Sequence, residues 1–126
     1  MTSPALQDII ALLGRPVAGN PAHYLFERAI DRAGLDARFL SADVPPERLA
    51  DALAGAAAMG FRGCLLAGAL REAALPLVAA ASPAATFAGA ASLLELGTAG
   101  FTAHMTDGRA AVEAVRAHRD PAGRRA

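Results

Sequence analysis

The sequence predicts an α/β domain: a three-layer αβα arrangement around a mostly parallel, mixed sheet, with a C-terminal β-hairpin. Short apolar runs alternate with segments of helical periodicity along most of the chain, which is typical of strands joined by helical crossovers. The last two apolar runs are separated only by a short glycine-containing turn, which indicates a hairpin. The length of 126 residues suits a single domain with one core.

Five apolar runs are predicted to form the strands. The first, "DIIALLG", ends at Gly14 and Pro16, and a continuous apolar run of this length is typical of a fully buried strand. The last two, "AASLLEL" and "GFTAHMT", are predicted to pair through a turn at Gly97 and Thr98. The predicted strands cover residues 8–14, 37–42, 62–67, 90–96 and 99–105.

The segments between these runs carry the signals of helix ends. Asn20 is a candidate N-cap, Pro21 occupies the first turn, and Gly34 is the expected stop of the first helix. Ser82 is the expected cap of a short helix at "SPAATF". The remaining helices are predicted from Pro45 or Pro46 to Met59, from about Ala69 to Ala80, and over "TDGRAAVEAVRAH".

Charge and composition exclude several classes of partner. All twelve basic residues are arginine and there are twelve acidic residues, so the formal net charge is zero and nothing predicts nucleic-acid binding. Without lysine, no side-chain ammonium is available for a Schiff base or for proton transfer. The N-terminal segment lacks the pattern of a signal peptide and no apolar run is long enough for a bilayer, so we expect no membrane partner and a cytoplasmic location.

The single cysteine and the three histidines predict no metal site. Cys64 is alone, which excludes an intrachain disulfide and a cysteine cluster, and its apolar strand predicts a buried, unreactive thiol. No two histidines have the spacing of metal ligands. His104 lies close to Asp107 in the sequence, and a role in the site depends on its strand directing it toward that acid.

Several sequence motifs, in their order and spacing, resemble those of one enzyme family over residues 8 to 117. They are "LLGRPVAGN", "GLDARFLSADVPPERLADAL", "MGFRGCLLAGALREAALPL", "SPAATFAGAASLLE" and "MTDG". Together they resemble the N-terminal, substrate-binding domain of the shikimate and quinate dehydrogenases, in a divergent form. The resemblance implies a substrate domain over residues 1–119, with 120–126 as a tail or as the start of a missing NADP-binding domain.

The resemblance implies two catalytic positions, Arg71 and Asp107. The family has a lysine at the first and an aspartate at the second. Arg71 keeps the positive charge but is a poor proton carrier, because a guanidinium stays protonated at any relevant pH. The alternatives are that Asp107 only caps a helix and that Arg71 is a solvated residue paired with a nearby acid.

Six further positions correspond to substrate contacts of the family, and most of them are changed. The family's two serines for the substrate carboxylate are replaced by Asn20 and Ala22. Its strand asparagine and threonine are replaced by Leu65 and Ala67, and a later asparagine by Ser92, whereas Thr106 is retained. These changes predict an altered pocket, for which a more apolar ligand is an expected consequence.

The family's activity implies NADP, but this chain has no G-x-G-x-x-G turn with which to bind it. We therefore predict no cofactor bound by this chain, no oxidation of shikimate by it alone, and NADP in a full-length parent. The predicted function is the substrate-binding half of a divergent oxidoreductase whose ligand is a small hydroxy acid or related molecule. The alternative is a non-catalytic module that binds a small molecule or a protein on the same fold, and either form could join a Rossmann domain or a second copy.

Overall fold

The fold is organised around a six-stranded mixed sheet, which a computed structural model describes within residues 7–118. The spatial order is β2-β1-β3-β5-β6-β4. β1 pairs in parallel with β2 and β3, β4 pairs in parallel with β6, and β5 runs antiparallel to both β3 and β6. The strands are β1 (Asp8–Gly14), β2 (Ala37–Asp43), β3 (Gly63–Leu66), β4 (Ala80–Ala81), β5 (Leu93–Gly97) and β6 (Gly100–His104). The predicted mixed, mostly parallel sheet is confirmed.

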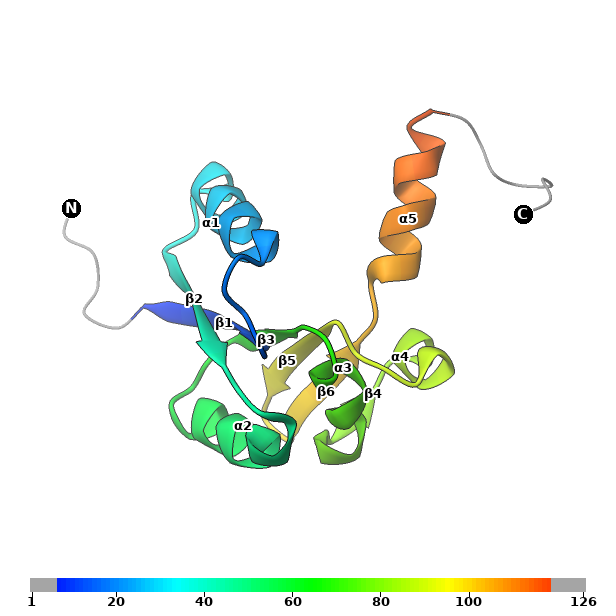
Figure 1. Ribbon diagram of the computed structural model, residues 1–126. Coiled ribbons are helices and arrows are strands. Elements are labelled where there is room, and N and C mark those ends of the chain that lie inside the picture. Colours follow the sequence, from blue (N-terminus) through cyan, green and yellow to red (C-terminus); the bar gives the residue numbers. More distant parts are fainter. Residues whose placement is uncertain (1–6, 119–126) are drawn as a thin grey trace.

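Helices lie on both sides of this sheet. They are α1 (Pro21–Ala33), α2 (Leu49–Ala58), α3 (Leu70–Ala73), α4 (Pro83–Ala88) and α5 (Asp107–Arg116), with the 3-10 helices η1 (Pro46–Arg48) and η2 (Leu75–Leu77). Figure 1 shows α1 and α5 on one side and α2 and α3 on the other. α5 points away from the sheet and contributes no buried residue, so the described part of the chain leaves its apolar side chains exposed.

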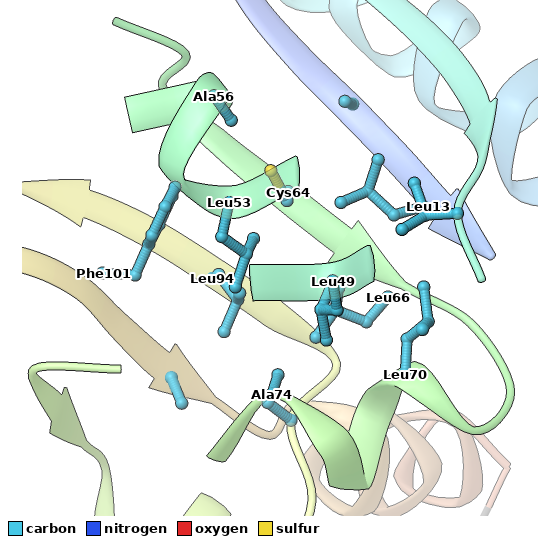
Figure 2. Packing of buried hydrophobic residues seen from close by; sticks show 14 of the residues in the cluster. Leu13, Leu49, Leu53, Ala56, Cys64, Leu66, Leu70, Ala74, Leu94 and Phe101 are labelled. Carbon is cyan, nitrogen blue, oxygen red and sulfur yellow. The ribbon is translucent and has the colours of Figure 1, made fainter. Parts of the chain in front are cut away.

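The larger hydrophobic cluster lies between the sheet and α2, α3 and α4. Leu49 and Leu53 of α2 and Leu70 of α3 pack against side chains of β3 and β5 such as Cys64 and Leu94 (Figure 2). Alanines fill much of the remaining volume, as expected from a composition with only 5% aromatic residues. This side of the sheet holds most of the buried apolar surface, which is the main favourable term in folding.

The opposite side has a smaller cluster beneath α1. It consists of Leu12, Ile30 and Phe39, with partly buried neighbours that include Leu65 and Ala67. The Phe26 ring stacks on Phe39 with centroids 5.5 Å apart, which fixes α1 over β1 and β2. The layer on this side is therefore incomplete over β3, β5 and β6 within the described residues.

The predicted helix ends are confirmed where the sequence carries a capping residue. Asn20 accepts the backbone N–H of Ala22 through Oδ1 at 2.9 Å, and Gly34 ends α1 with φ of 68°. Ser82 accepts the backbone N–H of Ala85 at 3.1 Å. These caps satisfy backbone groups that have no partner within the helix.

The single helix predicted from Ala69 to Ala80 is wrong. The segment forms α3, then η2, and then the two-residue strand β4. Pro76 has no N–H to continue a helix and restricts the residue before it. Beyond it, Ala79 and Ser82 donate to the carbonyl oxygens of Phe101 and Ala103, so pairing with β6 replaces helical hydrogen bonds.

The predicted C-terminal hairpin is present, but its turn differs from expectation. Gly97 pairs with Gly100, so the two loop residues are Thr98 and Ala99 and the turn lies one residue later than predicted. The hairpin is not the edge of the sheet, because β4 pairs with the outer side of β6.

The predicted tail or domain start at residues 120–126 lies outside the described residues, and the 1–119 boundary stays a prediction. Within residues 7–118, none of the helices has both the length and the apolar character needed to cross a bilayer.

Candidate functional site

The eight residues singled out from the sequence line one cavity of about 410 Å³. It lies at the carboxyl ends of β1, β3 and β6 and the amino end of β5, which meet at one edge because β5 runs the opposite way. Ligands of open α/β sheets bind at this edge. The predicted residues are Asn20, Ala22, Leu65, Ala67, Arg71, Ser92, Thr106 and Asp107.

Arg71 and Asp107 form an ion pair at this cavity, although 36 positions separate them in the sequence. Arg71 lies in α3 and donates through Nη2 to Oδ2 of Asp107, the first residue of α5. The same nitrogen lies 3.6 Å from Sδ of Met105. Arg71 is therefore directed across the cavity edge to a distant acid, and not to one near it in the sequence.

Among the described residues, the Asp107 carboxylate accepts no backbone N–H of α5, as the helix-capping alternative would require. Thr106 occupies the N-cap position of α5 and makes no side-chain capping bond, and the Asp107 carboxylate is used by Arg71. Asp107 is still in the first turn, where a negative charge interacts favourably with the helix dipole. Its position thus serves both the helix and the ion pair.

Arg71 carries an unusual local cost. Its Nε is buried and has no hydrogen-bond partner among the described residues. A buried donor without a partner costs free energy that an apolar replacement would not cost. The charged group is held at the cavity edge despite this penalty.

Ser92 and Thr106 form a second polar pair, brought together by the antiparallel pairing of β5 and β6. Ser92 Oγ accepts the backbone N–H of Thr106 at 3.0 Å and donates to the carbonyl oxygen of His104 at 3.3 Å. The two side-chain hydroxyls lie 3.1 Å apart. Both hydroxyls are therefore engaged within the chain.

Leu65 and Ala67 contribute apolar lining from β3 and the residue just after it. Leu12 of β1 and Leu93 of β5 also line the cavity, and each is the register partner of Leu65. Sequence reasoning missed both leucines, because cross-strand register cannot be read from a single apolar run. Phe26 was missed as well, since the helical pattern does not distinguish a cavity wall from core.

Two histidine clusters lie outside the predicted site. His104 Nε2 lies 3.1 Å from Oε1 of Glu95, so its strand directs it to that acid and not toward Asp107. His23 lies 2.6 Å through Nδ1 from Ser41 Oγ and 2.9 Å through Nε2 from Glu27, which links α1 to β2. Within residues 7–118, no three His, Cys, Asp or Glu side chains gather as metal ligands.

Cys64 lies on the opposite side of the sheet, fully buried among the α2 and α3 side chains. Removal of the thiol from water raises its pKa to about 11, because burial disfavours the thiolate. A neutral, inaccessible thiol is a poor nucleophile. Cys64 therefore contributes packing and does not belong to the site.

Comparison with known proteins relates this geometry to one family. The shikimate dehydrogenase (NADP(+)) of Streptococcus pyogenes serotype M49 is 34% identical to the chain over 109 residues, which cover 85% of this chain and 37% of that protein. The chain is a shikimate dehydrogenase-like domain. No protein-family model matches the chain.

Solved structures agree with this assignment. The shikimate 5-dehydrogenase of Thermus thermophilus, solved in complex with shikimate, is 30% identical and has a TM-score of 0.83, over 87% of this chain and 42% of that one. The 5-ketofructose reductase of Gluconobacter sp. strain CHM43 is 29% identical with a TM-score of 0.91, over 97% of this chain and 44% of that one. The chain thus spans less than half the length of each of these relatives.

Proposed function

We propose that the chain is the substrate-binding half of an NADP-dependent oxidoreductase related to shikimate dehydrogenase, with an altered substrate pocket. The observation that carries the proposal is the Arg71–Asp107 ion pair on a cavity lined by the other six predicted residues. The Thermus thermophilus relative has been solved with NADP(H) and shikimate, and the present chain covers 42% of its length. A further domain would supply the cofactor site.

The residues of this chain do not fit NADP by themselves. The turn after β1 reads "GRPVAGN" and lacks the glycine pattern that lets a backbone approach a pyrophosphate. The chain's own contribution is to hold a ligand at the edge of the sheet beside an acid and a fixed positive charge. Asp107 can accept a hydrogen bond or a proton, whereas Arg71 can only donate hydrogen bonds.

The test begins with the coding sequence around the chain. A glycine-rich strand–turn–helix in the same product favours the enzyme, and that product is assayed with NADP and a panel of secondary alcohols. Asp107→Asn should lower turnover by about 10²–10⁴-fold, the usual contribution of general acid–base groups. Glu113→Gln, on the same helix but outside the cavity, is the matched control and should leave turnover unchanged.

Two results would contradict the proposal. One is wild-type turnover in the Asp107→Asn variant. The other is a product that binds NADP and small alcohols but turns none of them over, which would support the non-catalytic module.

A further inference from the structure

The floor of the candidate cavity is a row of three leucine side chains. Leu12 of β1 is the register partner of Leu65 of β3, and Leu65 is the register partner of Leu93 of β5. Residues directly opposite one another on paired strands present their side chains to the same face of a sheet. Ala22 and Ala67 extend this apolar surface without adding a hydrogen-bonding group.

Uncharged polar side chains around the cavity are largely engaged inside the chain. Asn20 uses Oδ1 to cap α1, and Ser92 binds both the Thr106 backbone and the His104 carbonyl group. The Thr106 hydroxyl lies beside that of Ser92. A ligand that carries several hydroxyl groups would therefore lose its bonds to water and find few replacements.

The charged groups are balanced as well. Among the described residues that line the cavity, Arg71 and Asp107 alone are charged, and each neutralises the other. A carboxylate ligand would have to compete with Asp107 for the guanidinium. A hydroxyl group suits the pair better, because its oxygen accepts an N–H from Arg71 while its proton is donated to the Asp107 carboxylate. Among residues 7–118, the guanidinium donates both of its hydrogen bonds through Nη2, which leaves Nη1 for a ligand oxygen.

We propose that this cavity binds a neutral alcohol with an apolar ring or chain, its hydroxyl at Arg71 and Asp107 and its apolar body on Leu12, Leu65 and Leu93. The inference rests on the proposed function, because it assigns the substrate class of that same site. The cavity volume of about 410 Å³ is in the range of small-molecule sites. A hydroxyl-rich acid of similar size is disfavoured, since each hydroxyl left unpaired on the leucine floor lowers affinity by roughly 5- to 150-fold.

The experiment titrates the 126-residue chain with cyclohexanol and, separately, with shikimate, and follows backbone amide signals by nuclear magnetic resonance. We expect cyclohexanol to give saturable shifts at Leu65, Ala67 and Thr106, with a Kd at least about tenfold lower than that of shikimate. Cyclohexanecarboxylate tests the charge argument and should bind more weakly than cyclohexanol. Equal or tighter binding of shikimate at these residues, or no binding of cyclohexanol there, would overturn the inference.

Variants sharpen the test. Leu65→Asn with Ala67→Thr adds hydrogen-bonding groups to the floor and should weaken cyclohexanol binding at least about tenfold. Leu40→Asn, at an exposed position of β2 outside the cavity, is the matched control and should keep the wild-type preference. Ala67→Thr alone, at a half-buried position just beyond β3, should also weaken cyclohexanol binding. This single variant provides the test if the double variant fails to fold.

Failure of the inference and failure of the proposed function give different results. Binding of cyclohexanol by this chain, with no NADP-dependent turnover in the product that carries it, contradicts only the proposed function. NADP-dependent turnover of a hydroxyl-rich acid, with no preference for cyclohexanol in the binding assay, contradicts only the inference.

Discussion

The two faces of the sheet are built for different tasks. The face toward α2, α3 and α4 is packed with buried leucines, alanines and Cys64, whereas the face toward α1 buries only Leu12, Ile30 and Phe39 among the described residues. The candidate cavity opens toward the second face, where Leu12, Leu65 and Leu93 of the strands and Ala22 and Phe26 of α1 line it. Adjacent residues of one strand serve the two tasks, as Leu12 lines the cavity while Leu13 belongs to the larger core. Along β1, the alternation of side chains thus directs neighbouring leucines to the two faces.

The largest effect on the free energy of unfolding is expected when one leucine from each face is replaced by alanine. Leu94 is fully buried in the larger core, so Leu94→Ala should lower the free energy of unfolding by about 2–5 kcal/mol, from lost burial and the cavity left behind. Leu65→Ala removes a side chain that is only partly buried at the ligand cavity and should cost less than about 2 kcal/mol. Urea denaturation of both variants measures the difference. Equal losses would mean that the two faces contribute alike to stability.

A second prediction uses alkaline pH to probe the packed face. The pKa of Cys64 is raised from 9.0 to about 11 by burial, so between these values the unfolded chain loses the thiol proton while the folded chain keeps it. The contribution of the Cys64 thiol to the free energy of unfolding is therefore fully present below pH 9. It falls as the pH rises toward 11, by about 3 kcal/mol in all. Lysine is absent and there is one tyrosine, so few other side chains titrate in this window. The loss should be smaller in Cys64→Ala, as measured by denaturation at about pH 8 to 11, and an equal loss in both proteins would contradict the assignment.

The smallest of these effects concerns the contact between β3 and β5. A Cβ atom at Gly63 would lie 2.7 Å from the backbone oxygen of Leu94, so Gly63→Ala should force the strands apart and cost about 1–3 kcal/mol. Gly55 of α2 has no neighbouring atom within 4 Å of the corresponding position. Gly55→Ala should therefore be neutral or raise stability by up to about 1 kcal/mol, from better helix propensity. Thermal unfolding compares the pair, and a harmless Gly63→Ala would show that β3 and β5 can separate at no cost.

Local chemistry made much of the fold predictable. Asn20, Gly34 and Ser82 carry capping signals that depend only on nearby backbone, and each lies where it was expected. β4 was not predictable, because "AA" has no strand signal and exists as a strand only through its pairing with β6. In that segment tertiary pairing overrides the local preference for helix.

The candidate site was predicted through the family resemblance, and its missing members show the limit of that approach. The eight positions carried over from the family line one cavity, but the resemblance gave no reason to include Leu12, Leu93 or Phe26. Those three depend on strand register and on where α1 lies over the sheet, which are properties of the assembled fold. The pairing of His104 with Glu95 also depends on the assembled fold, because Glu95 lies on the neighbouring strand β5.

The antiparallel pairing of β3 with β5 has a consequence for how the domain opens. Within the sheet, it joins an N-terminal segment that holds β1, β2 and β3 to a C-terminal segment that holds β4, β5 and β6 through three register pairs. The cavity takes residues from both segments: Asn20, Ala22, Leu65 and Ala67 from the first, and Arg71, Ser92, Thr106 and Asp107 from the second. A fluctuation that separates the two segments would dismantle the cavity, so we expect a bound ligand to slow amide hydrogen exchange along this junction.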